Sequence, residues 1–168
     1  PQTLEEALDS GLLLAQGNDL AFRHELARVA VEVSLSPALA PSLHARILSA
    51  LDRSGAPETS LARCVHHAVR AGNAAAVRRL APEAALLAQK RGAHKEAAAQ
   101  WRTALAHAEG LALAERAAMF DALSYESYLI DRGEEALSAS SQARALWNAL
   151  GDVRREGDAL RWMSRLSW

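Results

Sequence analysis

The chain has 168 residues and a net charge of −1, and half of its residues are apolar while only 5% are aromatic. This length suffices for a hydrophobic core without disulfides or metal, and the charge balance disfavours a strongly basic nucleic-acid binder. The apolar half consists mostly of Ala and Leu, which favour helices, whereas β-branched residues are scarce. The composition therefore predicts an all-α fold and argues against an all-β fold or global disorder.

The sequence shows neither a membrane span nor a signal peptide. No window is apolar enough for a transmembrane helix, and the first residues lack a basic region followed by an apolar core. The single Cys64 has no partner for an internal disulfide, which fits a reducing compartment and predicts a cytoplasmic location. The chain begins with Pro1 rather than Met, and its last residues have the pattern of a helix that is cut short. We therefore expect a piece of a longer protein.

The first 36 residues predict a short helix followed by a small β-hairpin. The helix is expected over residues 3–10, with Thr3 as its N-cap and Gly11 at its end. Two short apolar runs, 12–15 and 20–23, flank a turn at 16–19 and predict the hairpin. From about His24 the apolar spacing becomes helical. The residues expected to share one face of this helix are Leu26, Ala30 and Val33.

Two further helices are predicted before the chain becomes repetitive, and they form a linker region over residues 37–72. The first spans roughly 38–53 and the second roughly 58–71, with a break at 54–57. The residues expected to face inward from the first helix are Leu43, Ile47, Leu48 and Leu51. Those expected in line on the second helix are Leu61, Val65 and Ala68.

From residue 73 onward the sequence repeats with a period of 39 residues. Two sets match at that offset: Ala97, Trp101 and Ala104, and then Ala136, Ser140 and Ala143. Each unit predicts two antiparallel helices, 74–91 with 94–109 and 114–131 with 134–149, and a helix at 153–167 begins a third unit. One hairpin cannot cover its own apolar face, so the hairpins are expected to stack. Pro82 is expected either to kink the 74–91 helix or to mark its true start near Ala81.

The repeated units resemble tetratricopeptide repeats. Gly92, Ala97, Trp101 and Ala104 have the spacing of the second half of such a repeat, and Asp131 stands where the family usually has Gly. The resemblance implies about two and a half divergent repeats over residues 73–168. The residues to which it assigns repeat packing are Ala97, Trp101, Ala104, Phe120, Leu123, Ala136 and Ala143.

The segment from Phe22 to Ala30 resembles the Phe-x-His-Asp/Glu-Leu-x-Arg-x-Ala stretch in the winged-helix subdomain of bacterial signal-transduction ATPases. Together with the linker and the repeats, it makes the chain similar to the regulatory arm of large ATP-binding LuxR-type transcriptional regulators and their MalT-like relatives. This resemblance implies that residues 1–36 are a partial winged-helix subdomain. It also implies that His24 contacts an ADP phosphate in the full-length protein, which would use ATP or ADP. The segment itself lacks a phosphate loop, so we expect it to hold no cofactor.

The resemblance implies a non-enzymatic sensor and interaction arm that binds a protein or small-molecule effector. DNA would be bound only by a module outside this segment, and no membrane contact is expected. A stand-alone tetratricopeptide-type adaptor for protein–protein interaction remains the alternative. A hydrolase is disfavoured because the chain has no nucleophile elbow and its paired carboxylates lie at predicted helix starts, where they interact with the helix dipole.

The charge is unevenly distributed, since residues 61–112 carry eight basic and three acidic side chains. A basic face of this kind attracts an acidic partner or a phosphorylated effector, although a solvated helix surface explains it equally well. The candidate partner-binding residues are Arg78, Arg79, Lys90, Arg91 and Lys95.

The histidines and the C-terminal tryptophans are the remaining candidates. His66 and His67 are neighbours on a predicted helix and are expected to point about 100° apart, so no metal site is predicted. Trp147, Trp162 and Trp168 are expected to pack between helices. If no helix follows them, Trp162 and Trp168 are expected to face solvent or a second copy in a homodimer.

Overall fold

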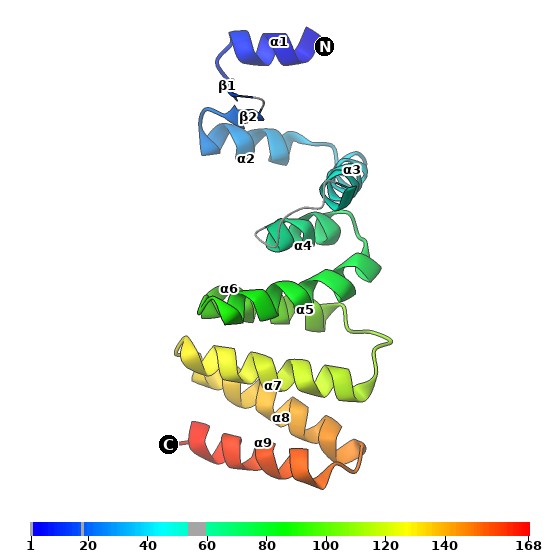
Figure 1. Cartoon of the computed structure of the whole chain (residues 1–168), viewed down its shortest axis with the longest axis vertical. Coiled ribbons are helices and arrows are strands. Elements are labelled where there is room, and N and C mark those ends of the chain that lie inside the picture. The colour runs from blue at the N-terminus through cyan, green and yellow to red at the C-terminus, as the bar shows by residue number, and fades with distance from the viewer. Residues whose placement is uncertain (1, 18, 54–59) are drawn as a thin grey trace. The chain divides into compact units, whose positions relative to one another are not determined.

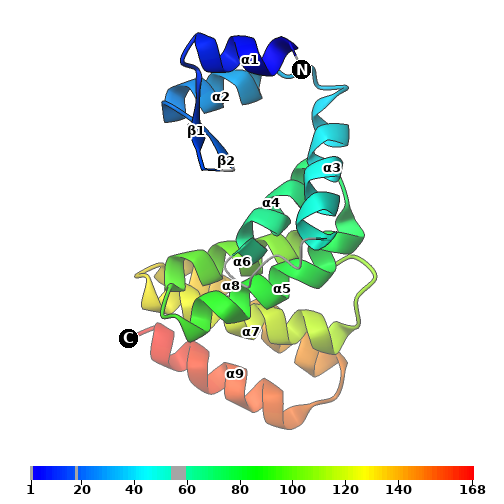
Figure 2. The same cartoon turned by 45° about the horizontal axis from the view of Figure 1, so that its top comes forward.

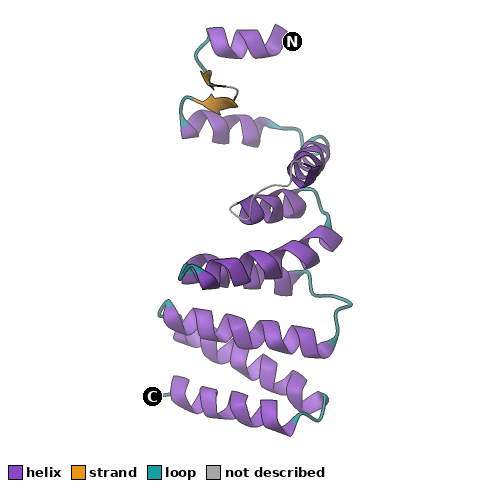
Figure 3. Ribbon diagram, viewed as in Figure 1, coloured by secondary structure: helices purple, strands orange, loops and turns teal. Residues whose placement is uncertain are grey.

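The computed structural model describes residues 2–17, 19–53 and 60–168. This part of the chain is mostly helical, with one two-stranded antiparallel sheet near the N-terminus (Figure 3). The predicted all-α fold with a single small β-hairpin is therefore confirmed. The chain divides into two compact units, Pro1–Pro41 and Ser42–Trp168, which we describe separately.

The first unit contains α1 (Gln2–Asp9), β1 (Leu13–Gln16), β2 (Asp19–Phe22) and α2 (Glu25–Ser34). The strands pair with Leu13 opposite Phe22 and Gln16 opposite Asp19. Asn18 in the predicted turn lies outside the described residues. The apolar face of α2 is uncovered, since Leu26 is 83% exposed and Val33 is 79% exposed. A unit of this size has too little chain to cover both faces of its helices.

Seven α-helices follow among the described residues, and α3 begins at the boundary between the units (Figure 1). They are α3 (Ala40–Arg53), α4 (Leu61–Arg70), α5 (Ala74–Lys90), α6 (His94–Ala106), α7 (Leu113–Leu129), α8 (Gly133–Ala149) and α9 (Val153–Leu166). From α4 onward each helix packs against the next one in the chain, as sequential antiparallel pairs. Figure 2 shows the α5–α6 and α7–α8 hairpins stacked, with α9 lying along the second hairpin. The start of the helix predicted at 58–71 lies outside the described residues.

Small side chains allow these helices to approach closely. Ala81 and Ala85 of α5, Ala97 of α6 and Ala136 of α8 are completely buried. Trp101 is 5% exposed and lies in the same core cluster as Leu123 of the next hairpin. An aromatic ring thus fills the space between hairpins that alanines cannot fill, which is the packing expected of stacked helical pairs.

Helix α5 is continuous through Pro82, so a start near Ala81 is wrong. Asn73 fixes the true start because its side-chain oxygen accepts a hydrogen bond from the backbone N–H of Ala76 at 3.0 Å. Pro82 lacks an N–H, so the carbonyl of Arg78 loses its usual helical partner. The surrounding core, with Ala81 and Ala84 buried, holds the helix together across this position.

The two hairpin turns use different residues for the same backbone conformation. Gly92 between α5 and α6 has φ +68°, and Asp131 between α7 and α8 has φ +58°. The two positions are one 39-residue period apart. The left-handed conformation ends each helix, and glycine adopts it without the steric cost that Asp131 carries.

None of the described helices combines the length and the hydropathy needed to cross a membrane.

Candidate functional site

The principal candidate site is a pocket of about 280 Å³ between α7 and α9, which we call the α7–α9 pocket. Its lining residues are Asp121, Tyr125, Arg155, Asp158, Ala159 and Trp162. The Trp162 ring lies 5.9 Å from that of Tyr125 and 5.2 Å from that of Tyr128, between ring centroids. Tyr125 is 50% exposed and Tyr128 is 40% exposed. Aromatic rings that are both clustered and exposed are typical of binding surfaces.

Hydrogen bonds hold the walls of this pocket in place. The indole N–H of Trp162 donates to the Ser124 hydroxyl at 2.8 Å, which fixes the ring against α7. The indole N–H of Trp147 donates to a carboxylate oxygen of Asp121 at 2.9 Å. The Arg155 guanidinium lies 5.3 Å above the Trp147 ring, within the range of a cation–π interaction. The pocket is thus built on two helices rather than on loops.

The electrostatics of the pocket centre on Asp121. Burial raises the pKa of this carboxyl, the nearby Asp158 acts in the same direction, and the bond from Trp147 and the charge of Arg155 lower it in part. The ionised form of Asp121 is therefore less favourable here than in water. A positive group bound in the pocket would relieve this cost. Because Asp158 already forms an ion pair with Arg161, Asp121 is the carboxylate most in need of such a partner.

A second polar centre lies between α5, α6 and α7. Glu126 is 1% exposed, and its carboxylate accepts a hydrogen bond from the Gln89 amide at 2.8 Å. Its other oxygen lies 2.8 Å from Nδ1 of His94. Both oxygens are thus satisfied within the protein, and the network joins the two hairpins. We interpret it as a structural element, since a buried carboxylate is tolerated only when it is paired.

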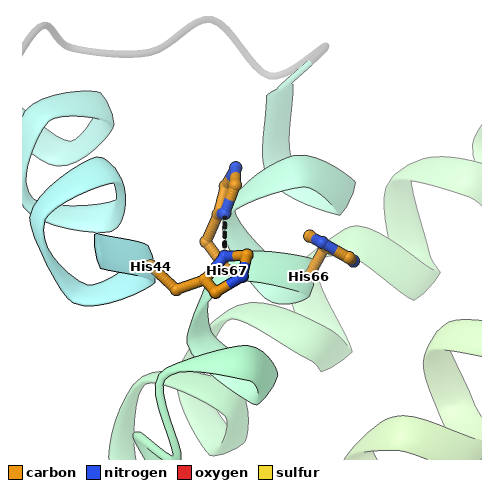
Figure 4. A group of neighbouring side chains, drawn as sticks. All are labelled: His44, His66 and His67. Carbon is orange, nitrogen blue, oxygen red and sulfur yellow. Dashed lines mark hydrogen bonds between the residues drawn. The ribbon is translucent and has the colours of Figure 1, made fainter. Parts of the chain in front are cut away.

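The structure also brings three histidines together: His44 of α3 with His66 and His67 of α4 (Figure 4). We call them the histidine cluster. The Nδ1 atoms of His44 and His67 lie 2.8 Å apart, so one donates its proton to the other. One nitrogen from each ring can be chosen so that all three lie within 4.8 Å of one another. His66 and His67 thus come nearer to one another than the expected separation of about 100° suggests, and the prediction of no metal site is not tested by this geometry.

His44 is the residue that sequence reasoning missed. It is 5% exposed and lies on the inner face of α3, four residues before the buried Leu48. That spacing is the available sequence signal, since positions four apart share a helix face. Its partner His67 is 23 residues away along the chain, and only the packing of α3 against α4 brings the two rings together.

The predicted basic residues fall into two groups rather than one. Lys90, Arg91 and Lys95 surround the α5–α6 turn, and all three are exposed. Arg78 and Arg79 lie near the start of α5, about 18 Å away along the helix axis at 1.5 Å per residue. A single anionic group cannot contact both sets. Binding of an acidic partner remains a prediction, and the α5–α6 turn is the place where three of these charges gather.

The residues assigned to repeat packing occupy the cores between the helices. Buried among them are Ala97, Trp101, Ala104, Leu123, Ala136 and Ala143, while Phe120 is half-buried and packs against both core clusters. Positions that match across the 39-residue period thus have matching surroundings.

His24 lies in the first unit, at the position that precedes α2. Its side chain is exposed and makes no capping hydrogen bond, while its backbone carbonyl accepts from the N–H groups of Ala27 and Arg28. The exposed ring is accessible to an external group. Its contact with an ADP phosphate stays a prediction.

The three C-terminal tryptophans do not form one cluster. Trp147 is buried, Trp162 is half-buried against α7, and Trp168 is fully exposed at the end of the chain. Tyr125, Tyr128 and Ser124 contact Trp162 within the chain, so only part of this ring remains available to solvent or to a second copy. Association of two copies through this end remains a prediction that rests on Trp168.

Comparison with known proteins gives no further assignment: no family model matches the chain, and neither a curated protein nor a solved structure matches it.

Proposed function

We propose that this chain is a non-enzymatic sensor and interaction arm, and that its α7–α9 pocket binds a cationic side chain of a protein partner. The single observation that carries the proposal is the pairing of a costly, partly buried Asp121 carboxylate with the exposed ring of Tyr125 and the half-buried ring of Trp162. Aromatic faces attract cations, and a carboxylate behind them adds charge attraction. A Lys or Arg side chain has both the length and the charge to use the two features together.

The stacked-hairpin fold supports the same proposal, because repeats of this kind offer extended surfaces whose specificity comes from a few side chains. On the strength of the sequence resemblance, we propose that this arm belongs to a bacterial LuxR-type ATP-dependent transcriptional regulator that acts in the cytoplasm and responds to an effector. In that setting ATP or ADP would be bound outside this segment. A stand-alone adaptor would use the pocket in the same way.

The experiment is a titration of the full chain with short peptides that differ at one position, followed by tryptophan fluorescence. A peptide with a central Arg or Lys is expected to bind saturably, and its norleucine and Glu counterparts are expected to bind at least threefold more weakly. The variants Tyr125→Ala and Asp121→Asn are each expected to weaken binding of the basic peptide about three- to fivefold, the size of one cation–π or ion-pair contact.

Glu134→Gln provides the matched control, since it removes one exposed negative charge at the start of α8, away from the pocket. This variant is expected to bind the basic peptide like the unmodified chain. Equal binding of the basic and norleucine peptides, or equal weakening by Glu134→Gln and Asp121→Asn, would contradict the proposal. Preference for the Glu peptide would instead favour the basic α5–α6 turn as the binding site.

A further inference from the structure

We propose that the histidine cluster binds one divalent transition-metal ion, with Zn²⁺ as the best fit, through one imidazole nitrogen each from His44, His66 and His67. The site lies on α3 and α4 and shares no residue with the α7–α9 pocket, so it is independent of the proposed function. Three protein ligands leave one coordination position of a tetrahedral ion open to water or to an external ligand.

The three nitrogens are near enough to one another for a tetrahedral site to form once the rings rotate. Zn²⁺–N bonds of about 2.0–2.1 Å place neighbouring ligand nitrogens about 3.3 Å apart. The Nδ1 atoms of His44 and His67 lie 2.8 Å apart, and the widest separation among the three chosen nitrogens is 4.8 Å. The ring centroids are 5.1 to 5.7 Å apart. Small rotations of the rings, above all of the exposed His66, bring all three nitrogens within reach of one ion.

Buried core residues flank the ligands on both helices. Leu48, four residues after His44, belongs to the same buried cluster as Cys64, Val65 and Ala68 of α4. His66 and His67 lie between Val65 and Ala68 in the sequence, so the two ligand-bearing helices share this cluster of buried side chains. His44 is itself 5% exposed and is confined by its surroundings. A site on two packed helices is more precise than one on loops.

The donor set selects the class of metal. Three imidazoles suit Zn²⁺, Cu²⁺, Ni²⁺ and Co²⁺, whereas Ca²⁺ and Mg²⁺ prefer oxygen ligands. Within the described residues the cluster includes no carboxylate and no thiol. The ring–ring hydrogen bond between His44 and His67 shows that at least one of these nitrogens already carries a lone pair directed at its neighbour. When a metal ion binds both Nδ1 atoms, the ring that donates takes its other tautomer, with the proton on Nε2.

The experiment is a titration of the metal-free full chain with Co²⁺, followed by the visible absorption of tetrahedral cobalt, and then displacement by Zn²⁺. One Co²⁺ per chain is expected, with loss of the cobalt spectrum when one equivalent of Zn²⁺ is added. His66→Ala is the decisive variant because His66 is the exposed member of the cluster and its removal leaves the core intact. It is expected to weaken cobalt binding at least tenfold, since even outer-sphere partners of a ligand contribute that much.

The control is the double variant His24→Ala/His107→Ala, which removes two histidines outside the cluster and is expected to bind Co²⁺ like the unmodified chain. Circular dichroism checks that each variant keeps its helices. A Zn²⁺-dependent rise in the melting temperature, present in the control and absent in His66→Ala, is the second expected result. The proposal is overturned if the chain gives no tetrahedral cobalt spectrum, or if His66→Ala and the control bind Co²⁺ with equal affinity.

Discussion

The indole N–H of Trp162 and the hydroxyl of Ser124 form a 2.8 Å hydrogen bond, and the same hydroxyl donates to the carbonyl of Ala136 at 2.7 Å. Ser124 is completely buried. One hydroxyl therefore joins α7, which carries it, to both α8 and α9. Since the Cβ of residue 124 lies at a close approach between helices, a larger side chain would not fit beside Ala136.

Ser124→Ala is expected to lower the free energy of unfolding by about 1–3 kcal/mol, because it removes a buried hydroxyl and leaves the Trp162 indole N–H and the Ala136 carbonyl without this partner. Trp162→Phe is expected to cost less hydrogen-bond energy, since it removes the donor while the Ser124 hydroxyl keeps its bond to the Ala136 carbonyl. Urea denaturation measures both. Ser141→Ala, at an exposed serine of α8, is expected to change stability by less than about 0.5 kcal/mol. Equal effects at Ser124 and Ser141 would show that the buried hydroxyl contributes nothing.

Asp131→Gly is expected to stabilise the chain by about 1 kcal/mol, because Asp131 has φ +58° and glycine adopts this conformation without steric cost. The opposite substitution, one 39-residue period earlier, tests the same backbone preference. Gly92 has φ +68°, and a methyl group added there would meet no heavy atom within 4 Å. Gly92→Ala is therefore expected to lower the free energy of unfolding by about 1 kcal/mol through the backbone conformation alone. Thermal unfolding of both variants checks the prediction, and a stabilising Gly92→Ala would refute it.

The ion pair between Arg102 and Glu135 predicts a specific dependence of stability on pH. The two side chains form a 2.6 Å contact that joins α6 to α8. This hydrogen bond lowers the pKa of Glu135 below its ordinary value of 4.5. A lowered pKa in the folded state means that the stabilisation is complete above pH 4.5 and is lost as the pH falls through the folded-state value.

Arg102→Gln is therefore expected to cost about 1 kcal/mol near neutral pH, and the difference from the unmodified chain is expected to shrink as Glu135 becomes protonated. Urea unfolding at a series of pH values measures the difference. Arg154→Gln, at an exposed arginine of α9, is the charge-matched control and is expected to show little effect at any pH. A gap between Arg102→Gln and the unmodified chain that stays constant down to low pH would rule out this linkage.

Glu126→Gln is expected to destabilise the chain by about 1–3 kcal/mol. The amide keeps an oxygen for Gln89 but turns an NH₂ group toward His94, where an acceptor is needed. Glu83→Gln makes the same change at an exposed position of α5 and is expected to be nearly neutral. Chemical denaturation distinguishes the two. Similar small effects in both variants would mean that water satisfies the Glu126 site as well as the protein does.

The helices from α5 to α9 were predictable from the sequence because each one has both a periodic apolar face and a clear end. Gly92 and Gly151 stop two of them in the left-handed conformation, and the boundaries agree with the 39-residue period to within a few residues. Pro82 was the exception. The missing N–H and the ring of this proline predict a kink or a helix start, but the buried Ala81 and Ala84 keep α5 continuous.

The candidate sites were less predictable, since they depend on contacts between distant parts of the chain. Ser124 and Trp162 are 38 residues apart, and His44 and His67 are 23 apart. Apolar periodicity shows which face of a helix is buried, but it does not show which polar groups meet on that face. It also could not show that the α2 face carrying Leu26 and Val33 stays uncovered, because that depends on what the rest of the unit provides.

The rate at which the Cys64 thiol reacts measures the local opening of α4. It is 6% exposed, and it is the only thiol in the chain. A thiol reagent can therefore modify the folded protein only when this helix moves away from its neighbours. The rate of labelling at increasing reagent concentration separates the rate of that movement from its equilibrium constant, without any engineered probe. The motion of the helix that carries His66 and His67 can thus be followed in the unmodified protein.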